Sequence, residues 1–172
     1  MLSNKSVIGV VFGGKSSEHE VSIESAKTIY NALSNESNKK LYLAKPIYID
    51  KFGYWHDYIF SESILFEKKD HLIVEESKDS LMNLSRINED IDIWFPSLHG
   101  PNGEDGVIQG LFRLTGKPFV GSGILGSSLG MDKIAMKSVF ESFNLPQVPY
   151  ISLEKKSIKD LKYIQSLIKD ID

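Results

Sequence analysis

Residues 7–22 read VIGVVFGGKSSEHEVS, and this stretch decides the fold class. Residues 7–12 form a short apolar run rich in β-branched side chains, which predicts a strand buried on both faces, as in a parallel sheet. After the glycine turn that follows, Ser17 and Glu20 fit a capping box, in which each side chain satisfies a free N–H group at the start of a helix. A strand, a glycine turn and a capped helix in this order predict the opening of a βαβ unit.

The rest of the first 120 residues continues to alternate between strand-like and helix-like segments, which predicts an α/β layer fold. At residues 50–53, Asp-Lys-Phe-Gly, we expect a turn in which Gly53 takes a positive φ. The first helix is expected to end near residues 34–35. Further strands are expected at residues 41–49, 64–66, 72–74, 91–96 and 118–120, and a helix at residues 107–114.

A change of composition after residue 120 marks a boundary between two parts of the chain. Residues 121–130 contain four glycines and three serines, which suits a hinge or tight turns at helix starts. The elements expected next are a helix at 132–143, a strand at 148–153 and an amphipathic helix from residue 157. That last helix has little chain left to pack against, so we expect a first domain at residues 1–125 and a second, incomplete one at residues 126–172.

The composition excludes several function classes. Of the 172 residues, 41% are hydrophobic and 25% charged, with a net charge of −3, which favours a folded domain over a disordered chain or a nucleic-acid binder. The absence of cysteine removes disulfides, thiolate nucleophiles and thiolate metal ligands, and it suits a reducing cytoplasm. No apolar run is long enough to span a bilayer and no signal peptide is apparent, so we expect a cytoplasmic protein without a membrane partner.

Two segments match the residue patterns of nucleotide-binding signatures, but their positions relative to the expected strands do not fit such sites. Residues 9–16, GVVFGGKS, fit the phosphate-loop pattern, but such a loop follows its strand, and residues 9–12 are most of the expected strand. Residues 121–126, GSGILG, fit the dinucleotide fingerprint, but they come after most of the sheet, and Glu154 is too distant to be the acidic partner. For both segments a structural turn is favoured over a nucleotide site.

Two other segments place polar groups beyond the carboxyl ends of expected parallel strands, where α/β sheets bind ligands. Glu18 lies in the first helical turn, where the helix dipole favours an anion; it suits a cationic ligand such as an ammonium group as well as it suits a structural role. Residues 99–106 read HGPNGEDG, in which glycine lets the backbone approach a ligand closely. Glu104 and Asp105 then open the next helix as dipole-matched anions, so this segment favours function over a plain surface turn.

The remaining charged and titratable residues give weaker indications. Lys133, in the first turn of its helix, opposes the helix dipole, a cost that an anion shared with the helix N-terminus would explain. His56 and His71 lie in polar surroundings and are expected on the surface. The Glu-His-Glu run at residues 18–20 does not predict a metal site, because adjacent helical residues point in different directions.

Four motifs, taken together, carry a resemblance to a known family. Residues 12–22 (FGGKSSEHEVS), 99–106 (HGPNGEDG), 121–123 (GSG) and 131–133 (MDK) closely resemble the D-alanine–D-alanine ligase family, in the family's order and over essentially the whole chain. The resemblance implies an ATP-grasp enzyme of three domains, in which residues 1–125 form a Rossmann-like, mostly parallel sheet flanked by helices. Residues 126–172 would then begin the central ATP-grasp domain.

The same resemblance implies roles for five residues. Glu18 resembles the carboxylate that orients the first D-alanine through its ammonium group, with Val21 lining the same pocket. His99 resembles the histidine beside the carboxylate of that substrate, and Glu104 matches an acidic residue of the same loop. Lys133 resembles the lysine that reaches the phosphates of ATP. No residue of this chain is matched to a metal ligand, and the catalytic set is not complete in it.

The implied reaction uses ATP and Mg²⁺, with Mn²⁺ as an alternative, to phosphorylate the carboxylate of the first D-alanine. The amine of a second D-alanine then attacks the acyl phosphate and gives a dipeptide for peptidoglycan synthesis. Family members are much longer, so the resemblance implies that the metal ligands, the second ATP lysine, the glycine-rich phosphate loop and the transition-state arginine follow Asp172. It also implies a homodimer when the protein is full-length, and an inactive chain when this part stands alone.

Two alternatives stay open at this point. The second substrate can be D-lactate or D-serine instead of D-alanine, because its binding site would lie after Asp172. The other alternative is a stand-alone, non-catalytic α/β domain that binds a ligand, and the incomplete second domain argues against it.

Overall fold

The computed structural model describes residues 5–67, 88–153, 162, 164–165 and 169. The chain forms two compact units, one ending at Ser128 and the other beginning at Leu129. Whether these units correspond to the domains expected at residues 1–125 and 126–172 stays a prediction. The sheet belongs to the first unit.

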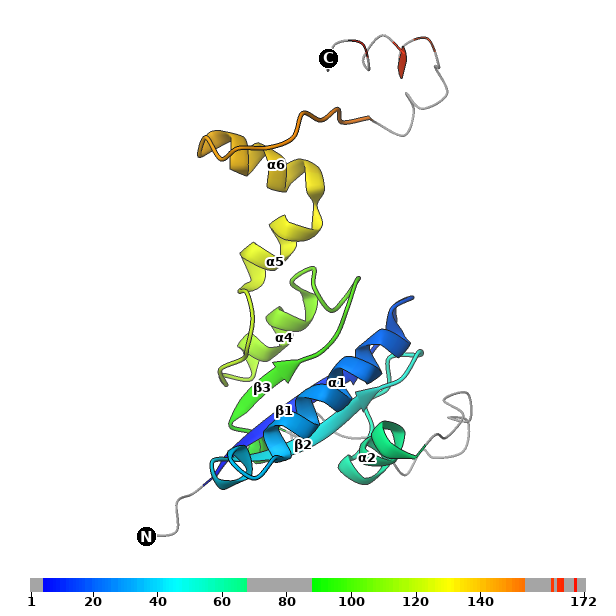
Figure 1. Cartoon of the computed structure of the whole chain (residues 1–172), viewed down its shortest axis with the longest axis vertical. Coiled ribbons are helices and arrows are strands. Elements are labelled where there is room, and N and C mark those ends of the chain that lie inside the picture. Colours follow the sequence, from blue (N-terminus) through cyan, green and yellow to red (C-terminus); the bar gives the residue numbers. More distant parts are fainter. Residues whose placement is uncertain (1–4, 68–87, 154–161, 163, 166–168, 170–172) are drawn as a thin grey trace. The chain divides into compact units, whose positions relative to one another are not determined.

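Three strands form the described sheet: β1 (Ser6–Gly13), β2 (Tyr42–Ile49) and β3 (Ile93–Pro96). Their order is β2-β1-β3, both neighbours run parallel to β1, and β1 therefore occupies the centre (Figure 1). Val11 is buried in one apolar cluster, and Val10 and Phe12 are buried in a second. The expectation of a strand buried on both faces of a parallel sheet is confirmed.

Helices contribute to both clusters, so both faces of the sheet are covered. Helices in the described part of this unit include α1 (His19–Ser34), the short 3-10 helix η1 (Asn38–Lys40), α2 (Tyr58–Phe66) and α4 (Val107–Leu114). α1 and α2 pack in the cluster of Phe12, whereas α4 packs in that of Val11, where the rings of Trp94 and Phe112 stack with centroids 4.9 Å apart. Within the described ranges, no helix combines the length and the apolar character needed to cross a bilayer.

Several expected elements are confirmed almost residue for residue. α4 coincides with the helix expected at residues 107–114, β2 fills all but the first residue of 41–49, and β3 lies within 91–96. In the turn after β2, Gly53 has the expected positive φ, 97°. These elements were predictable because their apolar periodicity or turn chemistry is local.

The strand expected at residues 64–66 is wrong, because these residues form the last turn of α2. Asp57 starts this helix: its side chain accepts a hydrogen bond from the Phe60 N–H group at 2.8 Å. Ile64 and Leu65 are buried against the sheet in helical conformation. Three consecutive apolar residues suit either conformation, and the cap decides between them. The strand expected at residues 72–74 lies outside the described residues.

The segment after α4 also differs from expectation. The strand expected at residues 118–120 is a single bridge, in which the Trp94 N–H group donates to Pro118 O and the Val120 N–H group donates to Trp94 O, both at 2.9 Å. Residues 121–130, expected as a hinge or as tight turns at helix starts, contain the start of α5 (Ile124–Met131) and are mostly helical.

The second unit contains α6 (Lys133–Ser142), which confirms the helix expected at residues 132–143. Asp132 is its N-cap, and the carboxylate accepts hydrogen bonds from two first-turn N–H groups, each at 3.0 Å. The strand expected at residues 148–153 is wrong, since these residues join no sheet with any described residue. The helix expected from residue 157 lies mostly outside the described residues.

Candidate functional site

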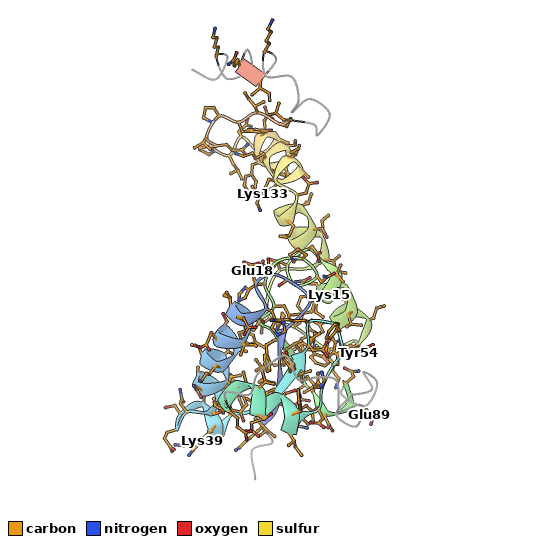
Figure 2. The ribbon with its side chains drawn as sticks, turned by 90° about the vertical axis from the view of Figure 1, so that its right-hand side faces the viewer. Lys15, Glu18, Lys39, Tyr54, Glu89 and Lys133 are labelled. Atoms are coloured by element: carbon orange, nitrogen blue, oxygen red, sulfur yellow. The ribbon has the colours of Figure 1, made fainter. Side chains whose placement is uncertain are left out.

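The carboxyl ends of the three parallel strands meet at one edge of the sheet, the edge where open α/β sheets bind ligands. A pocket of about 300 Å³ opens there, and its lining includes Lys15 after β1, Trp55 after β2 and His99 after β3. Figure 2 shows Lys15 and Glu18 at the end of this unit opposite Lys39. The fold therefore gathers the loops that carry the expected ligand-binding residues.

Glu18 contacts the second candidate segment directly. A Cβ atom at Gly100 would lie only 2.5 Å from Glu18 Oε2, and Gly100 has a φ of +71°. Glycine therefore serves two purposes here: it takes a backbone conformation that other residues disfavour, and it leaves room for the carboxylate. The structure thus brings Glu18 and the loop of residues 99–106 together, as the sequence predicts.

The start of α1 differs from the expected capping box. The helix begins at His19 with Glu18 as the N-cap, and no side chain caps it. The Glu18 N–H group donates to Ser16 Oγ at 3.2 Å, and Glu20 forms an ion pair with Lys51 at 2.9 Å. The capping box was wrong because the turn at Ser16 carries the chain one residue further before the helix starts.

The loop of residues 99–106 is held in shape by its own carboxylates. Glu104 Oε2 accepts a hydrogen bond from the Gly100 N–H group at 2.7 Å. Asp105 accepts from the N–H groups of Asn102 and Val107, at 2.9 and 3.1 Å. Glu104 therefore fixes the backbone that Glu18 contacts; whether it also touches a substrate stays a prediction.

A buried glutamine and a close backbone contact complete this loop. Gln109 Nε2 donates to Gly103 O at 2.8 Å and is buried beneath it. A Cβ atom at Gly103 would lie 2.7 Å from Leu98 Cβ, so only glycine fits there without displacement. The spacing of glycines in HGPNGEDG thus reflects the close packing of the loop on itself.

His99 has one described partner. Its Nε2 atom lies 3.1 Å from Ser25 Oγ on α1, and the residue lines the pocket. The sequence predicted a ligand-binding role for His99 but not the contact with α1. That role stays a prediction, while the structure shows that the ring is held from one side.

Two further polar residues of α1, His19 and Ser22, are fully buried, and sequence reasoning missed both. His19 Nδ1 donates to Gly14 O at 2.7 Å. Ser22 Oγ accepts from the Gly13 N–H group at 2.8 Å and donates to Ser97 O at 2.5 Å, so it joins the ends of β1 and β3. Their three-residue spacing on a helix that follows a glycine turn is the signal that could have identified them.

Tyr48 of β2 completes this buried arrangement. Burial, with smaller contributions from the negative charges of Asp50 and Glu20, raises the pKa of Tyr48 well above its ordinary value. The phenol therefore keeps its proton and donates to His19 Nε2, 3.0 Å away. The loop after β1 is thus connected to β2 through side chains that keep their polar groups paired.

The loop after β2 is organised by a buried acidic residue and histidine. His56, expected on the surface, is 0% exposed, and its Nε2 lies 3.0 Å from Asp50 Oδ2. Asp50 Oδ1 also accepts from the N–H groups of Phe52 and Tyr54, at 2.8 and 3.0 Å. The expectation failed because the partner of His56 is supplied by the turn, and polar neighbours in sequence do not imply exposure. His71 lies outside the described residues.

Val21 and Lys133 are less clearly placed for ligand binding. Val21 is 56% exposed and does not line the pocket described above. Lys133 belongs to the second unit, where its Nζ donates to Gly130 O at 2.5 Å. The N-terminus of α6 is capped by the Asp132 carboxylate, and whether Lys133 shares a bound anion with this helix end stays a prediction. A contact of either residue with a substrate stays a prediction.

The phosphate-loop match at residues 9–16 is a strand and its turn. Residues 9–13 lie within β1, and the N–H groups of Gly13 and Gly14 are occupied by Ser22 Oγ and Ile49 O. A phosphate-binding loop needs such N–H groups free to turn inward. The structural interpretation of this segment therefore holds.

Metal ligands are not clustered in the part of the chain that the structure describes. No group of three or more His, Asp or Glu side chains there is arranged to hold an ion. The two carboxylates of the loop at residues 99–106, those of Glu104 and Asp105, are engaged by backbone N–H groups. The described residues therefore do not fit a metal centre.

Residues 7–122 match a family described as D-ala D-ala ligase N-terminus. The D-alanine–D-alanine ligase of Prochlorococcus marinus strain NATL2A is 75% identical over 172 residues, which are 100% of this chain and 49% of that protein. The corresponding ligase of Synechococcus strain CC9605 is 46% identical over 173 residues, with 100% and 49% covered. The chain thus spans about half the length of the curated relatives it matches.

Solved structures of similar proteins agree with the sequence matches. The D-alanine–D-alanine ligase of Coxiella burnetii superposes with a TM-score of 0.77 at 34% identity, covering 96% of this chain and 49% of that one. The VanG D-Ala:D-Ser ligase of Enterococcus faecalis gives a TM-score of 0.71 at 29% identity, covering 95% and 49%. The resemblance carried by the four motifs is confirmed.

Proposed function

The chain belongs to the D-ala D-ala ligase N-terminus family, and we propose that it is the part of an ATP-dependent D-alanine–D-alanine ligase that binds the first D-alanine. In this reaction ATP transfers its terminal phosphoryl group to the carboxylate of the first D-alanine and leaves as ADP, and the amine of the second D-alanine attacks the acyl phosphate. This attack forms the amide bond and expels inorganic phosphate. The dipeptide is used for peptidoglycan synthesis in the cytoplasm.

The observation that carries this proposal is the contact between Glu18 and the loop that holds His99. A free amino acid presents an ammonium group and a carboxylate on one carbon atom, so its binding site needs an anion and a hydrogen-bond donor on neighbouring segments. Glu18 supplies the anion beside Gly100, and His99, the residue before Gly100, lines the pocket. Charge-assisted hydrogen bonds of this kind contribute about 1.5–3 kcal/mol each.

The contribution of these residues is positioning. The loops after β1 and β3 are tied together by Ser22, and the loop of His99 is braced by Glu104. A carboxylate held in a fixed orientation toward a phosphoryl donor reacts much faster than one that diffuses freely. We propose that this part of the enzyme orients the first D-alanine, with Val21 at the edge of the substrate.

The nucleotide part of the proposal rests on family membership. We propose that Lys133 binds the phosphates of ATP, for which its ammonium group must leave Gly130 O. The described residues do not fit a metal centre. We therefore propose that Mg²⁺ or Mn²⁺ is held by the part of the relatives' length that this chain does not span, and that the full-length enzyme is a homodimer.

The direct test is the reaction itself in a full-length protein that carries this chain. With ATP, Mg²⁺ and D-alanine, we expect release of phosphate together with D-alanyl-D-alanine, identified by mass spectrometry. Competition with D-serine and D-lactate measures the choice of second substrate. Binding of D-alanine without phosphate release would instead support a non-catalytic binding domain.

A further inference from the structure

Three polar side chains on α1 recur at every third residue and contact the loops at the strand ends: His19, Ser22 and Ser25. We call them the α1 polar row. His19 and Ser22 are fully buried and hold backbone atoms of the strand-end loops. Ser25 differs, because it contacts a side chain, His99, that is expected to bind substrate.

The Ser25 hydroxyl group is paired with His99 instead of with the helix backbone. A serine or threonine inside a helix ordinarily donates to the carbonyl one turn earlier. Thr28, on the same helix, does so, donating to Glu24 O at 3.2 Å. In the described part of the chain, Ser25 is paired with His99 Nε2 alone, at 3.1 Å. Donation by the hydroxyl to Nε2 gives the hydroxyl hydrogen a partner among the described residues, whereas donation by an Nε2–H group does not.

This direction decides which nitrogen of His99 carries the proton. A neutral imidazole has one N–H group and one acceptor nitrogen, and a hydrogen bond at one nitrogen sets the role of the other. With Nε2 as the acceptor, a neutral ring carries its hydrogen on Nδ1. No described residue pairs with Nδ1, and His99 lines the pocket. The Nδ1–H group is thus left as a donor for a ligand.

We propose that Ser25 is a positioning residue for His99, which it holds as the Nδ1–H tautomer so that this group donates to the carboxylate of the first substrate amino acid. The opposite tautomer would turn a lone pair toward that carboxylate and repel it. The identity of the ligand rests on the proposed function. The tautomer of His99 and its dependence on Ser25 are independent of the proposed function.

The tautomer is measured on this chain by NMR after labelling histidine with ¹⁵N, at pH 8.5, where a histidine ring is ordinarily neutral. The signal of His99 is assigned by its loss in His99→Gln. We expect Nδ1 to carry the proton in the unchanged chain, a shift toward Nε2–H in Ser25→Ala, and restoration in Ser25→Thr, which keeps the hydroxyl. An Nε2–H ring in the unchanged chain would overturn the proposal.

The consequence for binding is measured in the full-length protein. Ser25→Ala should raise KM for the first D-alanine about three- to tenfold with a smaller change in kcat, as expected when one hydrogen bond that orients a ligand-binding group is lost. Ser25→Thr should stay within about twofold of the unchanged enzyme. The matched control is Ser63→Ala on α2, whose hydroxyl donates to Phe60 O at 2.8 Å, and it should change neither KM nor the His99 signal.

The two readouts separate this inference from the proposed function. A full-length protein that makes no dipeptide, but whose His99 depends on Ser25, would refute the function and support the positioning role. An active enzyme whose Ser25→Ala variant keeps both its KM and its tautomer would refute the positioning role. If Ser25→Ala does not fold, the tautomer of the unchanged chain and the Ser25→Thr variant still decide.

Discussion

The carboxylate of Glu18 lies against the backbone of Gly100, so closely that a Cβ atom there would be 2.5 Å from Oε2. These residues follow two different strands and meet because β1 and β3 are parallel neighbours. Glu104 holds the same glycine through its N–H group. The contact between Glu18 and this loop therefore requires glycine at position 100. Substitutions at Glu18 and at Gly100 both test it.

For Glu18→Gln we expect KM for the first D-alanine to rise about ten- to a hundredfold in the full-length protein, the equivalent of about 1.5–3 kcal/mol. Glu18 is exposed and its side chain caps no N–H group of α1, so the melting temperature should hardly change. Steady-state kinetics and thermal melting measure the two effects. A lower melting temperature with unchanged affinity would make Glu18 a structural residue.

For Gly100→Ala we expect a loss of both stability and affinity. The φ of +71° disfavours alanine by about 1–2 kcal/mol. The new methyl group also displaces the Glu18 carboxylate, which should raise KM for D-alanine. The control is Gly116→Ala, in the turn after α4 and outside the pocket lining, at a φ of +72° with no atom within 4 Å of the added Cβ. It should lose similar stability without a change in KM, and equal KM effects in both variants would argue against the Glu18 site.

Asp50→Ala should destabilise the fold by about 3–5 kcal/mol, because it removes the carboxylate that pairs with the buried His56 and accepts from two backbone N–H groups. Asp57→Ala removes a single hydrogen bond at the N-cap of α2 and should cost only about 1 kcal/mol. Urea denaturation of this chain measures both values. Similar losses in the two variants would show that the Asp50–His56 pair adds little.

Lys133→Ala should raise KM for ATP in the full-length protein, whereas Lys15→Ala should leave it nearly unchanged. Lys15 follows a turn whose N–H groups are occupied by protein atoms, so no phosphate-binding loop is formed there. The comparison uses ATP titrations at saturating D-alanine. A larger effect from Lys15→Ala would support the phosphate-loop interpretation of residues 9–16.

The 172-residue chain by itself is expected to release no phosphate from ATP when D-alanine is added. Its described residues offer one candidate for binding ATP, Lys133, and they do not fit a metal centre. Groups that position a reaction act as a unit, so a partial set gives little rate. A coupled phosphate assay measures this, and phosphate release stimulated by D-alanine would show that the chain is catalytically complete.

Local patterns accounted for much of the fold. The apolar run of residues 7–12 predicted a central strand, and the amphipathic pattern of 107–114 predicted α4 with its bounds. Patterns shorter than one helical turn were ambiguous, and the run at 64–66 was misassigned for that reason. The strand expected at 148–153 failed because a strand requires a partner that its own sequence does not specify.

The sequence by itself determined the α/β class, the family and the candidate groups Glu18 and His99, because motifs and apolar spacing are properties of neighbouring residues. Only the tertiary structure decided that Glu18 rests on Gly100, that Ser25 holds His99, and that His56 is buried against Asp50. A polar side chain is buried only where a partner satisfies its hydrogen bonds. For the buried His56 that partner comes from the turn after β2, whereas Glu18 and Ser25, which are not fully buried, meet residues that follow a distant strand end. Parallel pairing of β1 and β3 brings those residues there.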